Sequence, residues 1–463
     1  MYNKKAHIHF VGIGGIGMSG IATILKHQGY EISGCDTDHS QQSIQNLVSL
    51  GCSVYQGNNC ASCHNPHIDI LVYSSAIKSD DPEIVAAQKR GIPTIPRALM
   101  LAELMRTKFS IAIAGAHGKT TTTSLISHIL MEARFDPTII IGGHLKTLST
   151  NAYFGNGNFL VAEADESDRS LLHLHATLAV VTNINLEHLE TYRDLEDIKN
   201  TFKHFLSNLP FYGKAIVCID DPNIQSILPI AHIKTVKYGI ENWQQADIYA
   251  TDINLEAEYS TFSVYKRNKE HLGTVKLSIP GHHNVLNALA AITLALDIDI
   301  PFKTISAALT SFKGIERRFS YNGSFKGIEI FDDYGHHPKE ITSVLTVAKK
   351  RAKKGLTVVF QPHRYTRTDK LWDYFVQVFA DSRIDHLVIT DIYPASEQPI
   401  QGINSKDLVK SIKNKNPKLS ISYVPFESDF SSLKHELLTK MHSGDLLLLL
   451  GAGKVNNLAR HIL

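Results

Sequence analysis

Twice in this sequence an apolar strand runs directly into a glycine-rich turn and then into a helix. The first instance, "HIHFVGIGGIGMSGIATILKHQGY", begins at His7, and the second, "FSIAIAGAHGKTTTTSLISHILMEA", begins at Phe109. Further short apolar runs then alternate with helical patterns as far as "DLLLLLGAG" near the C-terminus. Because strands that alternate with helices form parallel sheets covered by helices, the sequence predicts the α/β fold class.

The length of 463 residues corresponds to roughly three domains of about 150 residues each. We expect a Rossmann-like N-terminal domain over residues 1–107, which contains the first strand, turn and helix. A central domain like the P-loop ATPases, with a mostly parallel sheet, is expected over 108–314. The third unit, 315–463, is predicted to be a second Rossmann-like α/β domain, with a hinge between about Ser311 and Gly323.

The charge balance and the cysteine content restrict the partners and the compartment. A net charge of +2, from 47 basic and 45 acidic residues, gives no electrostatic reason to expect nucleic acid or a membrane as a partner. The N-terminal stretch lacks the apolar region of a signal peptide, and the longest apolar run is far shorter than a membrane span. Five cysteines form no even disulfide framework, so we expect a cytoplasmic protein.

The first glycine loop matches the pattern G-x-G-x-x-G through Gly12, Gly14 and Gly17, with Asp36 after the next short strand. This context is typical of a dinucleotide site. The backbone N–H groups and the helix N-terminus of such a loop attract any diphosphate. The pattern alone therefore leaves open NAD, a UDP compound, or a tight turn with no ligand.

The second glycine loop resembles a phosphate loop with one residue missing. The usual pattern is G-x-x-x-x-G-K-[ST], but Ile113 stands five places before Gly118, and the nearest upstream glycine is Gly115. The loop still offers backbone donors, the Lys119 cation for the β- and γ-phosphates, and the Thr120 hydroxyl for Mg²⁺. An ATP site is the interpretation we favour.

Acidic and amide side chains follow the next two predicted strands. The residues concerned are Glu163, Asp165, Glu166, Asn183, Asn185, Glu187 and His188. Any one of these side chains could be a helix cap or a solvated loop residue. Carboxylates at two consecutive strand ends beside a phosphate loop are, however, what Mg²⁺ coordination requires, because this ion prefers oxygen ligands.

A series of motifs along nearly the whole chain closely resembles the Mur ligases of bacterial peptidoglycan synthesis. In order, they are "VGIGGIGMSG", "GAHGKTTT", "EADESD", "TNI" followed by "EH", "GHHNVLNALAA", "GIERRF", "DDYGHHP" and "QPHRYTRT". The nucleotide loop of that family is G-x-x-G-K-[ST], which is shorter than the usual phosphate loop. The resemblance therefore accounts for the absence of a glycine at Ile113.

The resemblance implies an ATP-dependent, amide-forming ligase of peptidoglycan precursor synthesis. Its implied substrates are ATP, UDP-N-acetylmuramate and L-alanine, and its implied cofactor is Mg²⁺. ATP would convert the muramoyl carboxylate into an acyl phosphate, which the amine of alanine then attacks with release of phosphate. Catalysis of this kind needs alignment and charge neutralisation rather than an enzyme nucleophile. We expect a monomer or a homodimer.

The family's site residues carry over where the motifs match. The residues implied to bind the UDP sugar are Gly14, Gly15, Ile16, Gly17, Asp36, Ser74 and Ser75. Those implied to bind ATP are Gly115, Ala116, His117, Gly118, Lys119, Thr120, Thr121, Asn284, Asn287, Arg317 with its neighbour Arg318, and Asp333. The implied amino-acid pocket is Tyr334, His336, His363 and Arg367. The implied metal ligands are Thr120, Glu163 and His188, and the implied catalytic residues are Lys119, Glu163, His188, His336 and Arg367.

Three departures from the family pattern stand out. Asn185 and Glu187 occupy positions where relatives often carry other acidic residues. Some Mur ligases use a carbamylated lysine for a second Mg²⁺, but neither Lys199 nor Lys203 matches that position well. Lys454 stands where an acidic residue is frequent, and we assign it no role.

The segment "CASCHNPH" allows other chemistry. Cys60, Cys63 and His64 match the haem-attachment pattern C-x-x-C-H, and His67 adds a fourth possible zinc ligand. Haem attachment requires export, which the N-terminus does not indicate. We interpret the segment as a variable loop, with zinc as the alternative.

Three other functions compete with the alanine ligase. An NAD-dependent oxidoreductase would use the first loop but would leave Lys119 and Thr120 without a role. A nucleotide-binding regulatory module would not explain polar strand ends in all three units. A recycling ligase that attaches a preformed tripeptide to the same UDP sugar is the nearest rival, and "GIGGIGMSG" with "DESDR" favours the alanine enzyme.

Overall fold

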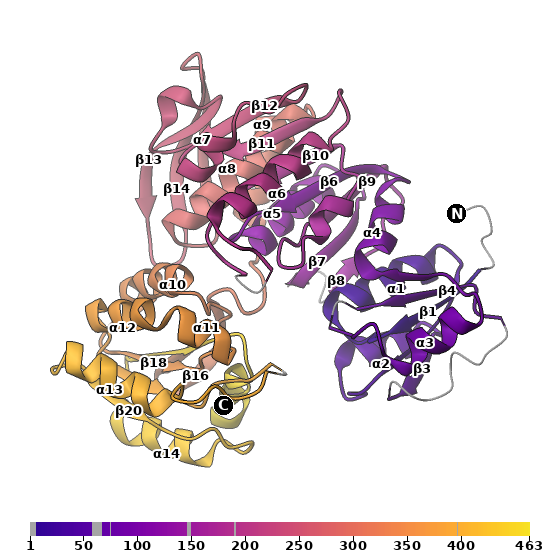
Figure 1. Cartoon of the computed structure of the whole chain (residues 1–463). Helices are drawn as coiled ribbons and strands as arrows, with labels where there is room; N and C mark the ends of the chain where they lie inside the picture. Colours follow the sequence, from indigo (N-terminus) through magenta and orange to yellow (C-terminus); the bar gives the residue numbers. More distant parts are fainter. Residues whose placement is uncertain (1–5, 58–66, 75, 146–149, 189–190, 396) are drawn as a thin grey trace. The chain divides into compact units, whose positions relative to one another are not determined.

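In the computed structural model the chain consists of α/β units built on three sheets, which confirms the predicted fold class (Figure 1). The structure describes residues 6–57, 67–74, 76–145, 150–188, 191–395 and 397–463. Contacts divide the chain into two compact units. The first comprises Met1–Ile253, Thr261–Leu277 and Asn284–Lys313, and the second comprises Asn254–Ser260, Ser278–His283 and Gly314–Leu463.

The N-terminal sheet is parallel throughout and has the strand order β3-β2-β1-β4-β5. Its central strand β1 is buried at all five positions, as expected of a parallel strand with both faces covered. Val11, Cys35 and Leu71 pack there against Ile84 and Ala87 of helix α3. The elements are β1 (His7–Val11), α1 (Ile16–His27), β2 (Glu31–Asp36), α2 (Gln42–Ser49), β3 (Ser53–Gln56), β4 (Ile70–Tyr73), α3 (Pro82–Lys89), β5 (Thr94–Pro96) and α4 (Arg97–Met105).

The central sheet has the order β15-β14-β13-β12-β11-β10-β6-β9-β7-β8. Strand β6 lies between β10 and β9 and is parallel to both, so the carboxyl ends of these three strands meet at one edge. The strands are β6 (Phe109–Ala114), β7 (Thr138–Leu145), β8 (Thr150–Tyr153), β9 (Phe159–Glu163), β10 (Leu178–Val181), β11 (Lys214–Cys218), β12 (Lys234–Gly239), β13 (Ile248–Leu255), β14 (Ser260–Lys266) and β15 (His271–Leu277). The helices are α5 (Lys119–Glu132), η2 (Ser170–His173), α6 (Leu195–Ser207), α7 (Pro222–Ile227), η3 (Trp243–Gln245), α8 (His282–Asp297) and α9 (Phe302–Ser311).

The C-terminal sheet has the order β16-β17-β21-β18-β19-β20, with β16 antiparallel to β17 and the other pairs parallel. Its strands are β16 (Ser320–Phe325), β17 (Ile328–Asp333), β18 (Leu356–Phe360), β19 (His386–Ile389), β20 (Ser420–Tyr423) and β21 (Leu446–Leu450). Its helices are α10 (Pro338–Arg351), α11 (Tyr365–Lys370), α12 (Trp372–Asp381), α13 (Ser405–Lys415), α14 (Ser431–Lys440), η4 (Val455–Asn457) and α15 (Leu458–Ile462).

Helices cover both faces of this C-terminal sheet, which explains the five consecutive leucines of β21. Leu446, Leu448 and Leu450 belong to the core on one face, together with helices α10, α12 and α13 (Figure 1). Leu447 and Leu449 belong to the core on the other face, together with α14 and α15. Because successive side chains of a strand point to opposite faces, a strand covered on both sides needs an unbroken apolar run.

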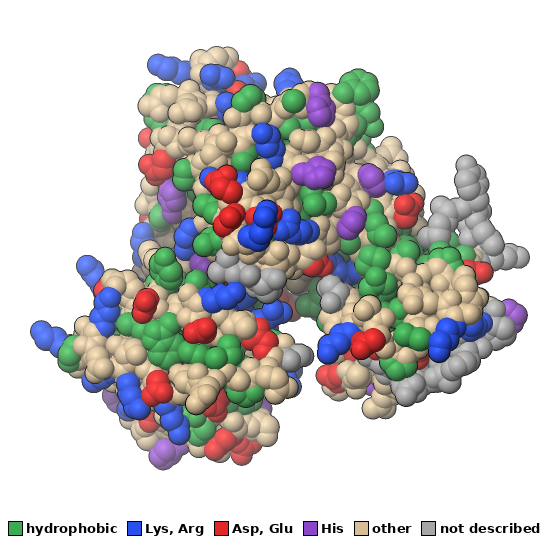
Figure 2. Space-filling model, viewed as in Figure 1, with side chains coloured by type: hydrophobic (Ala, Val, Ile, Leu, Met, Phe, Trp, Pro, Cys, Tyr) green, Lys and Arg blue, Asp and Glu red, His purple; other side chains and the backbone are tan. Residues whose placement is uncertain are grey.

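Among the described residues, no helix combines the length and the apolar character that crossing a membrane requires. On the face drawn in Figure 2, basic and acidic side chains are interspersed over the surface rather than gathered by sign. This pattern fits the small net charge of the sequence.

Two buried histidines share one serine hydroxyl in the N-terminal sheet. Ser33 Oγ lies 2.7 Å from His7 Nε2 and 2.8 Å from His9 Nδ1. A hydroxyl can donate to one ring nitrogen and accept from the other, so Ser33 provides a partner for one nitrogen of each imidazole. Burial, with a smaller contribution from His7, lowers the pKa of His9 from 6.5 to about 4. This strand therefore folds with His9 uncharged.

We predict that β1 loses stability in acid because of His9. Unfolded His9 binds a proton below its ordinary pKa of 6.5, whereas folded His9 stays neutral down to about pH 4. The contribution of His9 is complete above pH 6.5 and falls by up to about 3 kcal/mol as the pH approaches 4. Amide hydrogen exchange of the β1 peptide measures this loss. In His9→Leu the pH-dependent loss should be smaller by that amount, and an equal loss in both proteins would contradict the assignment.

Candidate active site

The second glycine loop joins β6 to α5 and has the backbone of a phosphate-binding turn. Gly115 and Gly118 have φ angles of +137° and +85°, which side chains rarely tolerate. A Cβ atom at Gly115 would lie 2.1 Å from Thr182 Oγ1, and one at Gly118 would lie 2.4 Å from Asn287 Oδ1. Both glycines are therefore required by backbone conformation and by close neighbours.

The loop is anchored to the next strand end by Asn183. The backbone N–H of His117 donates to Asn183 Oδ1 over 2.9 Å, and the backbone N–H of Ala116 donates to the Asn183 carbonyl over 3.2 Å. Asn183 Nδ2 in turn donates to the carbonyl of His117 over 2.9 Å. Thr120 and Thr121 follow in the first turn of α5, whose N-terminus favours anions. The predicted ATP loop thus forms a preorganised turn.

The Lys119 ammonium lies in the loop and faces a carboxylate. Its Nζ is 2.7 and 2.8 Å from the two oxygens of Glu166 and 2.6 Å from the carbonyl of Gly115. Burial disfavours the charged ammonium, but the adjacent Glu166 outweighs burial and raises the pKa of Lys119. Lys119 is therefore held as a cation at the carboxyl end of the sheet.

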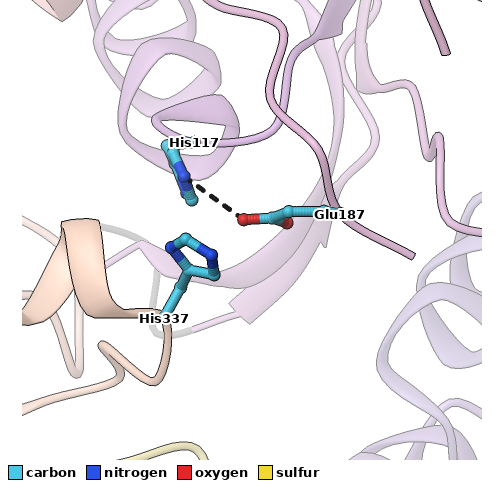
Figure 3. Close-up of side chains that lie close together, drawn as sticks. All are labelled: His117, Glu187 and His337. Carbon is cyan, nitrogen blue, oxygen red and sulfur yellow. Dashed lines mark ion pairs between the residues drawn. The ribbon is translucent and has the colours of Figure 1, made fainter. Parts of the chain in front are cut away.

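Acidic side chains from the two neighbouring strand ends meet beside Lys119. His188 Nε2 lies 3.4 Å from Glu166 Oε1 and 3.7 Å from Glu187 Oε2, and these three side chains could share one ion. His117 Nε2 lies 3.2 Å from Glu187 Oε1 (Figure 3). Two carboxylates and an imidazole around one point suit a divalent cation, and the two carboxylates supply the oxygen ligands that Mg²⁺ prefers.

The predicted metal ligands occupy different parts of this edge. His188 belongs to the group just described, whereas Glu163 Oε1 accepts a hydrogen bond from the backbone N–H of Gly142 over 2.9 Å. No metal-holding group that includes Glu163 is formed by the His, Cys, Asp and Glu side chains that the structure describes. The set of Thr120, Glu163 and His188 stays a prediction.

Glu166 was not predicted as a partner of Lys119.

The predicted asparagines of α8 lie against the phosphate loop. Asn287 Oδ1 accepts from Thr122 Oγ1 over 3.3 Å, and Asn287 Nδ2 donates to Asn284 Oδ1 over 3.3 Å. Asn287 is buried and lies directly over Gly118. Through these contacts Asn287 packs against the phosphate loop and supports its conformation.

The first glycine loop is held by its predicted acidic residue. Asp36 Oδ2 accepts a hydrogen bond from the backbone N–H of Gly14 over 2.8 Å, and a Cβ atom at Gly14 would lie 2.9 Å from the same oxygen. Gly15 and Ile16 are exposed at the start of α1. Ser74 follows β4 and donates its backbone N–H to Val11 over 3.2 Å.

Some sequence predictions fall on residues outside the described part of the chain. These residues are Ser75, Cys60, Cys63 and His64. His67 is described and exposed.

Arg97 is a residue of this region that the sequence did not reveal. A Cβ atom at Gly17 would lie 2.7 Å from Arg97 Nη1, so the guanidinium packs against the first turn of α1. Arg97 Nη2 also lies 3.4 Å from Asp165 Oδ2 of the acidic strand end. No local pattern marks this arginine, because both contacts come from distant segments.

In the second unit, Asp333 ends β17 and shapes the loop that follows. Its Oδ2 accepts from the backbone N–H of Phe319 over 2.7 Å, and its Oδ1 accepts from that of Gly335 over 2.6 Å. Burial raises the pKa of Asp333 to about 6, although Arg318 opposes this shift. Arg317 donates to the carbonyl of Gly451 over 2.7 Å. These predicted nucleotide residues are thus fixed in the C-terminal domain.

The four residues of the predicted amino-acid pocket lie together in the second unit. The ring centroids of Tyr334 and His336 are 5.5 Å apart, and those of His336 and His363 are 5.7 Å apart. Arg367 Nη1 lies 3.1 Å from His363 Nδ1. Tyr393, which was not predicted, stacks on His363 at 5.5 Å.

The two histidines of this cluster are neutral near pH 7. Burial lowers the pKa of His336 to about 4, and burial together with His336 lowers that of His363 to about 3. Arg367 is therefore the cation of this group. One guanidinium beside neutral hydrogen-bonding rings suits a small zwitterion, since the cation can bind its carboxylate.

Models of protein families match nearly the whole chain in three consecutive segments. Residues 7–109 match "Mur ligase family, catalytic domain", and residues 113–295 match "Mur ligase middle domain". Residues 317–453 match "Mur ligase, glutamate ligase domain".

Several curated proteins are similar over nearly their full length. A "UDP-N-acetylmuramate--L-alanine ligase" from Geobacter sp. (strain M21) is 48% identical over 456 residues, which cover 98% of this chain and 96% of the relative. The protein of that name from Desulfotalea psychrophila is 48% identical over 457 residues, which cover 98% of this chain and 97% of the relative.

Solved structures agree with this similarity. A UDP-N-acetylmuramate-alanine ligase from Thermotoga maritima superposes with a TM-score of 0.81 at 27% identity, covering 98% of both chains. A murein peptide ligase from Psychrobacter arcticus gives a TM-score of 0.74 at 24% identity, covering 99% of this chain and 98% of that one, and supports the fold alone.

We predict that Gly118→Ala weakens nucleotide binding. The new Cβ would displace buried Asn287 and break its hydrogen bonds to Thr122 and Asn284, distorting the loop. The affinity for a fluorescent ATP analogue should fall by about tenfold, which corresponds to ~1.4 kcal/mol.

Gly91→Ala provides the matched control for this variant. Gly91 also has a positive φ, +72°, but nothing lies within 4 Å of its missing Cβ. The control should lose about 1 kcal/mol of stability from its backbone strain and keep its affinity for the analogue. Equal affinities for the two variants would contradict the role of the contact with Asn287.

Proposed function

The chain belongs to the Mur ligase family, and from this premise we propose that it joins L-alanine to the carboxylate of UDP-N-acetylmuramate and converts ATP to ADP and phosphate. The observation that carries the proposal is 48% identity, over nearly the full length of both chains, to curated UDP-N-acetylmuramate–L-alanine ligases. The preorganised phosphate loop around Lys119 supplies the matching chemistry.

The reaction proceeds in two steps. A carboxylate oxygen of the muramoyl group attacks the γ-phosphorus of ATP, and ADP leaves, which gives an acyl phosphate. The amine of alanine then attacks the acyl carbon, and the tetrahedral intermediate expels phosphate and loses a proton to give the amide. Both steps depend on aligned reactants and on neutralised phosphoryl charge.

Lys119 and the N-terminus of α5 bind the ATP phosphates in this proposal. The ammonium is paired with Glu166, which orients the cation at the loop. Loop geometry of this kind lowers the cost of ordering the site when ATP binds. Asn284 and Asn287 support the nucleotide from α8, and Arg317 and Asp333 serve it from the C-terminal domain.

Mg²⁺ is the cofactor that we propose for the acidic strand ends. Thr120, Glu163 and His188 are its proposed ligands, with Glu166 and Glu187 beside His188. When bound, the ion would neutralise negative charge on the ATP phosphates. The Thr120 hydroxyl, the Glu163 carboxylate and the His188 imidazole would hold the ion.

Tyr334, His336, His363 and Arg367 form the proposed alanine site. The Arg367 guanidinium binds the alanine carboxylate, and neutral His336 accepts a hydrogen bond from the amine and orients it. The proposed UDP-sugar site is the first glycine loop, Gly14 to Gly17, with Asp36, Ser74 and Ser75. Its backbone N–H groups suit the diphosphate.

We propose a cytoplasmic location, which suits the water-soluble substrates ATP, alanine and a nucleotide sugar. Cys35, Cys52 and Cys218, the cysteines that lie in the described ranges, are buried and are not joined to one another by a disulfide, as expected in a reducing compartment. The small net charge gives no reason to propose a nucleic-acid partner. A monomer or a homodimer is the assembly that we propose.

Phosphate release from ATP tests the proposal against its nearest rival. The protein is given UDP-N-acetylmuramate and ATP with either L-alanine, a preformed tripeptide, or no acceptor. Alanine-dependent release is expected, because relatives that are 48% identical to this chain carry that activity in their names. Release that depends on the tripeptide would transfer the assignment to the recycling ligase. If neither alanine nor the tripeptide increased phosphate release above the control without acceptor, both assignments would be refuted.

We predict that Lys119→Ala lowers kcat by about 10³-fold, because the variant lacks the cation that neutralises the transferred phosphoryl group. Binding of UDP-N-acetylmuramate should be unaffected, since that ligand uses the N-terminal domain. Calorimetric titration and steady-state phosphate release measure the two quantities.

Lys266→Ala is the matched control for loss of a lysine. Lys266 is the last residue of strand β14 and forms an ion pair with Glu270 over 3.2 Å. Both side chains are exposed. Its removal should leave kcat unchanged. Turnover of Lys119→Ala close to that of the control would exclude the role given to Lys119.

A further inference from the structure

Two loops that carry active-site side chains are tied together by a set of residues outside the site. The loop after β9 carries Glu166, and the loop after β10 carries His188. The residues that tie them are Arg169, Thr191, Tyr192, Asp197 and Thr201, which we call the Arg169 clamp. The mechanism above uses none of them.

Arg169 is at the centre of the clamp. Its Nη2 lies 2.6 Å from Asp197 Oδ2 and 3.3 Å from the carbonyl of Thr191, and its Nη1 donates to Thr201 Oγ1 over 3.3 Å. Its guanidinium also stacks over the Tyr192 ring, 4.5 Å from the ring centroid. A planar guanidinium can make several directed hydrogen bonds and a stacking contact at once, which a lysine cannot.

Two short hydrogen bonds connect the clamp to the loop of Glu166. Tyr192 Oη donates to the carbonyl of Glu166 over 2.6 Å, and Thr191 Oγ1 donates to the carbonyl of Ser167, also over 2.6 Å. Tyr192 is buried, and burial raises the pKa of its hydroxyl, so the hydroxyl keeps its proton and remains a donor. The backbone that follows the Glu166 side chain is therefore fixed at two successive carbonyls.

The same residues also hold the backbone of His188. The N–H groups of Thr191 and Tyr192 donate to the carbonyl of His188 over 2.8 and 3.0 Å. The side chains of Glu166 and His188 meet at 3.4 Å, and Glu166 holds Lys119 at 2.7 Å. A displacement of either loop would thus change where the Lys119 ammonium lies.

We propose that Arg169 is a positioning residue that, through Tyr192 and Asp197, fixes the Glu166 and His188 loops against each other and so sets the place of the Lys119 ammonium at the phosphate loop. The effect on turnover rests on the proposed function. Arg169 touches none of the reacting groups, and it acts through the backbone of the two loops.

The clamp can be weakened without leaving a buried charge unpaired. Asp197 also accepts from the backbone N–H of Arg193 over 3.2 Å and lies in the first turn of α6, where a negative charge is favourable. Variants at Arg169 should therefore fold.

The test compares Arg169→Met with Lys214→Met. Lys214 pairs with Asp297 over 2.7 Å, with side chains 28% and 14% exposed, much as Arg169 and Asp197 are 35% and 10% exposed. Lys214 begins β11, which is parallel to β10, so it lies at the opposite edge of the sheet. Both variants lose one ion pair of similar burial, and thermal unfolding monitors that loss.

We expect kcat of Arg169→Met to fall by about 10- to 100-fold, because small displacements of aligned groups have effects of this size. KM for UDP-N-acetylmuramate should not change. Arg169→Lys, which keeps the charge beside Asp197, should recover part of the lost kcat. Tyr192→Phe, which keeps the ring and loses the hydrogen bond to the Glu166 carbonyl, should also lower kcat.

A kcat for Arg169→Met equal to that of Lys214→Met would overturn the proposal, whatever the loss of thermal stability. The affinity of the whole chain for a fluorescent ATP analogue separates this outcome from a failure of the proposed function. A wild-type protein that binds the analogue but releases no phosphate with alanine would contradict the function alone. The clamp is then judged by affinity: weaker binding in Arg169→Met than in Lys214→Met supports it, and equal binding refutes it.

Discussion

The ion pair between Lys119 and Glu166 is the interaction on which the central site depends. It joins the loop after β6 to the loop after β9, and the same carboxylate faces His188 after β10. A buried carboxylate and a partly buried ammonium are costly to separate, so each fixes the position of the other. The Gly115 carbonyl and the Asn183 side chain complete this arrangement. These contacts within the protein therefore hold the shape of the phosphate loop.

The strand order explains why these residues can meet. Because β6 is paired in parallel with β9 on one side and β10 on the other, three loops leave the same edge of the sheet side by side. Ligands of open α/β sheets bind at such carboxyl ends. The C-terminal sheet repeats this principle: Asp333 ends β17, and His363 follows β18 closely. Parallel order thus concentrates polar side chains at strand ends while the strands themselves stay apolar.

The sequence alone supported the α/β class and the two glycine loops, because both follow from local patterns of strand, turn and helix. The grouping of Tyr334, His336, His363 and Arg367 was anticipated from the family motifs and is observed in the structure. The contacts that Glu166, Arg97 and Tyr393 make with other residues of the two sites were not predicted. Their roles depend on contacts between segments far apart in the chain, which a single sequence does not encode locally. For the same reason, the sequence does not show which of the neighbouring carboxylates would bind a metal ion.

The central claim is that the muramoyl carboxylate is activated by direct phosphorylation before alanine attacks. The most direct measurement uses UDP-N-acetylmuramate labelled with ¹⁸O in both carboxylate oxygens, followed by mass spectrometry of the released phosphate. The acyl-phosphate route predicts one labelled oxygen in each phosphate formed with alanine, because the oxygen that attacked phosphorus leaves with it. Phosphate without label, accompanied by normal amide formation, would contradict the account.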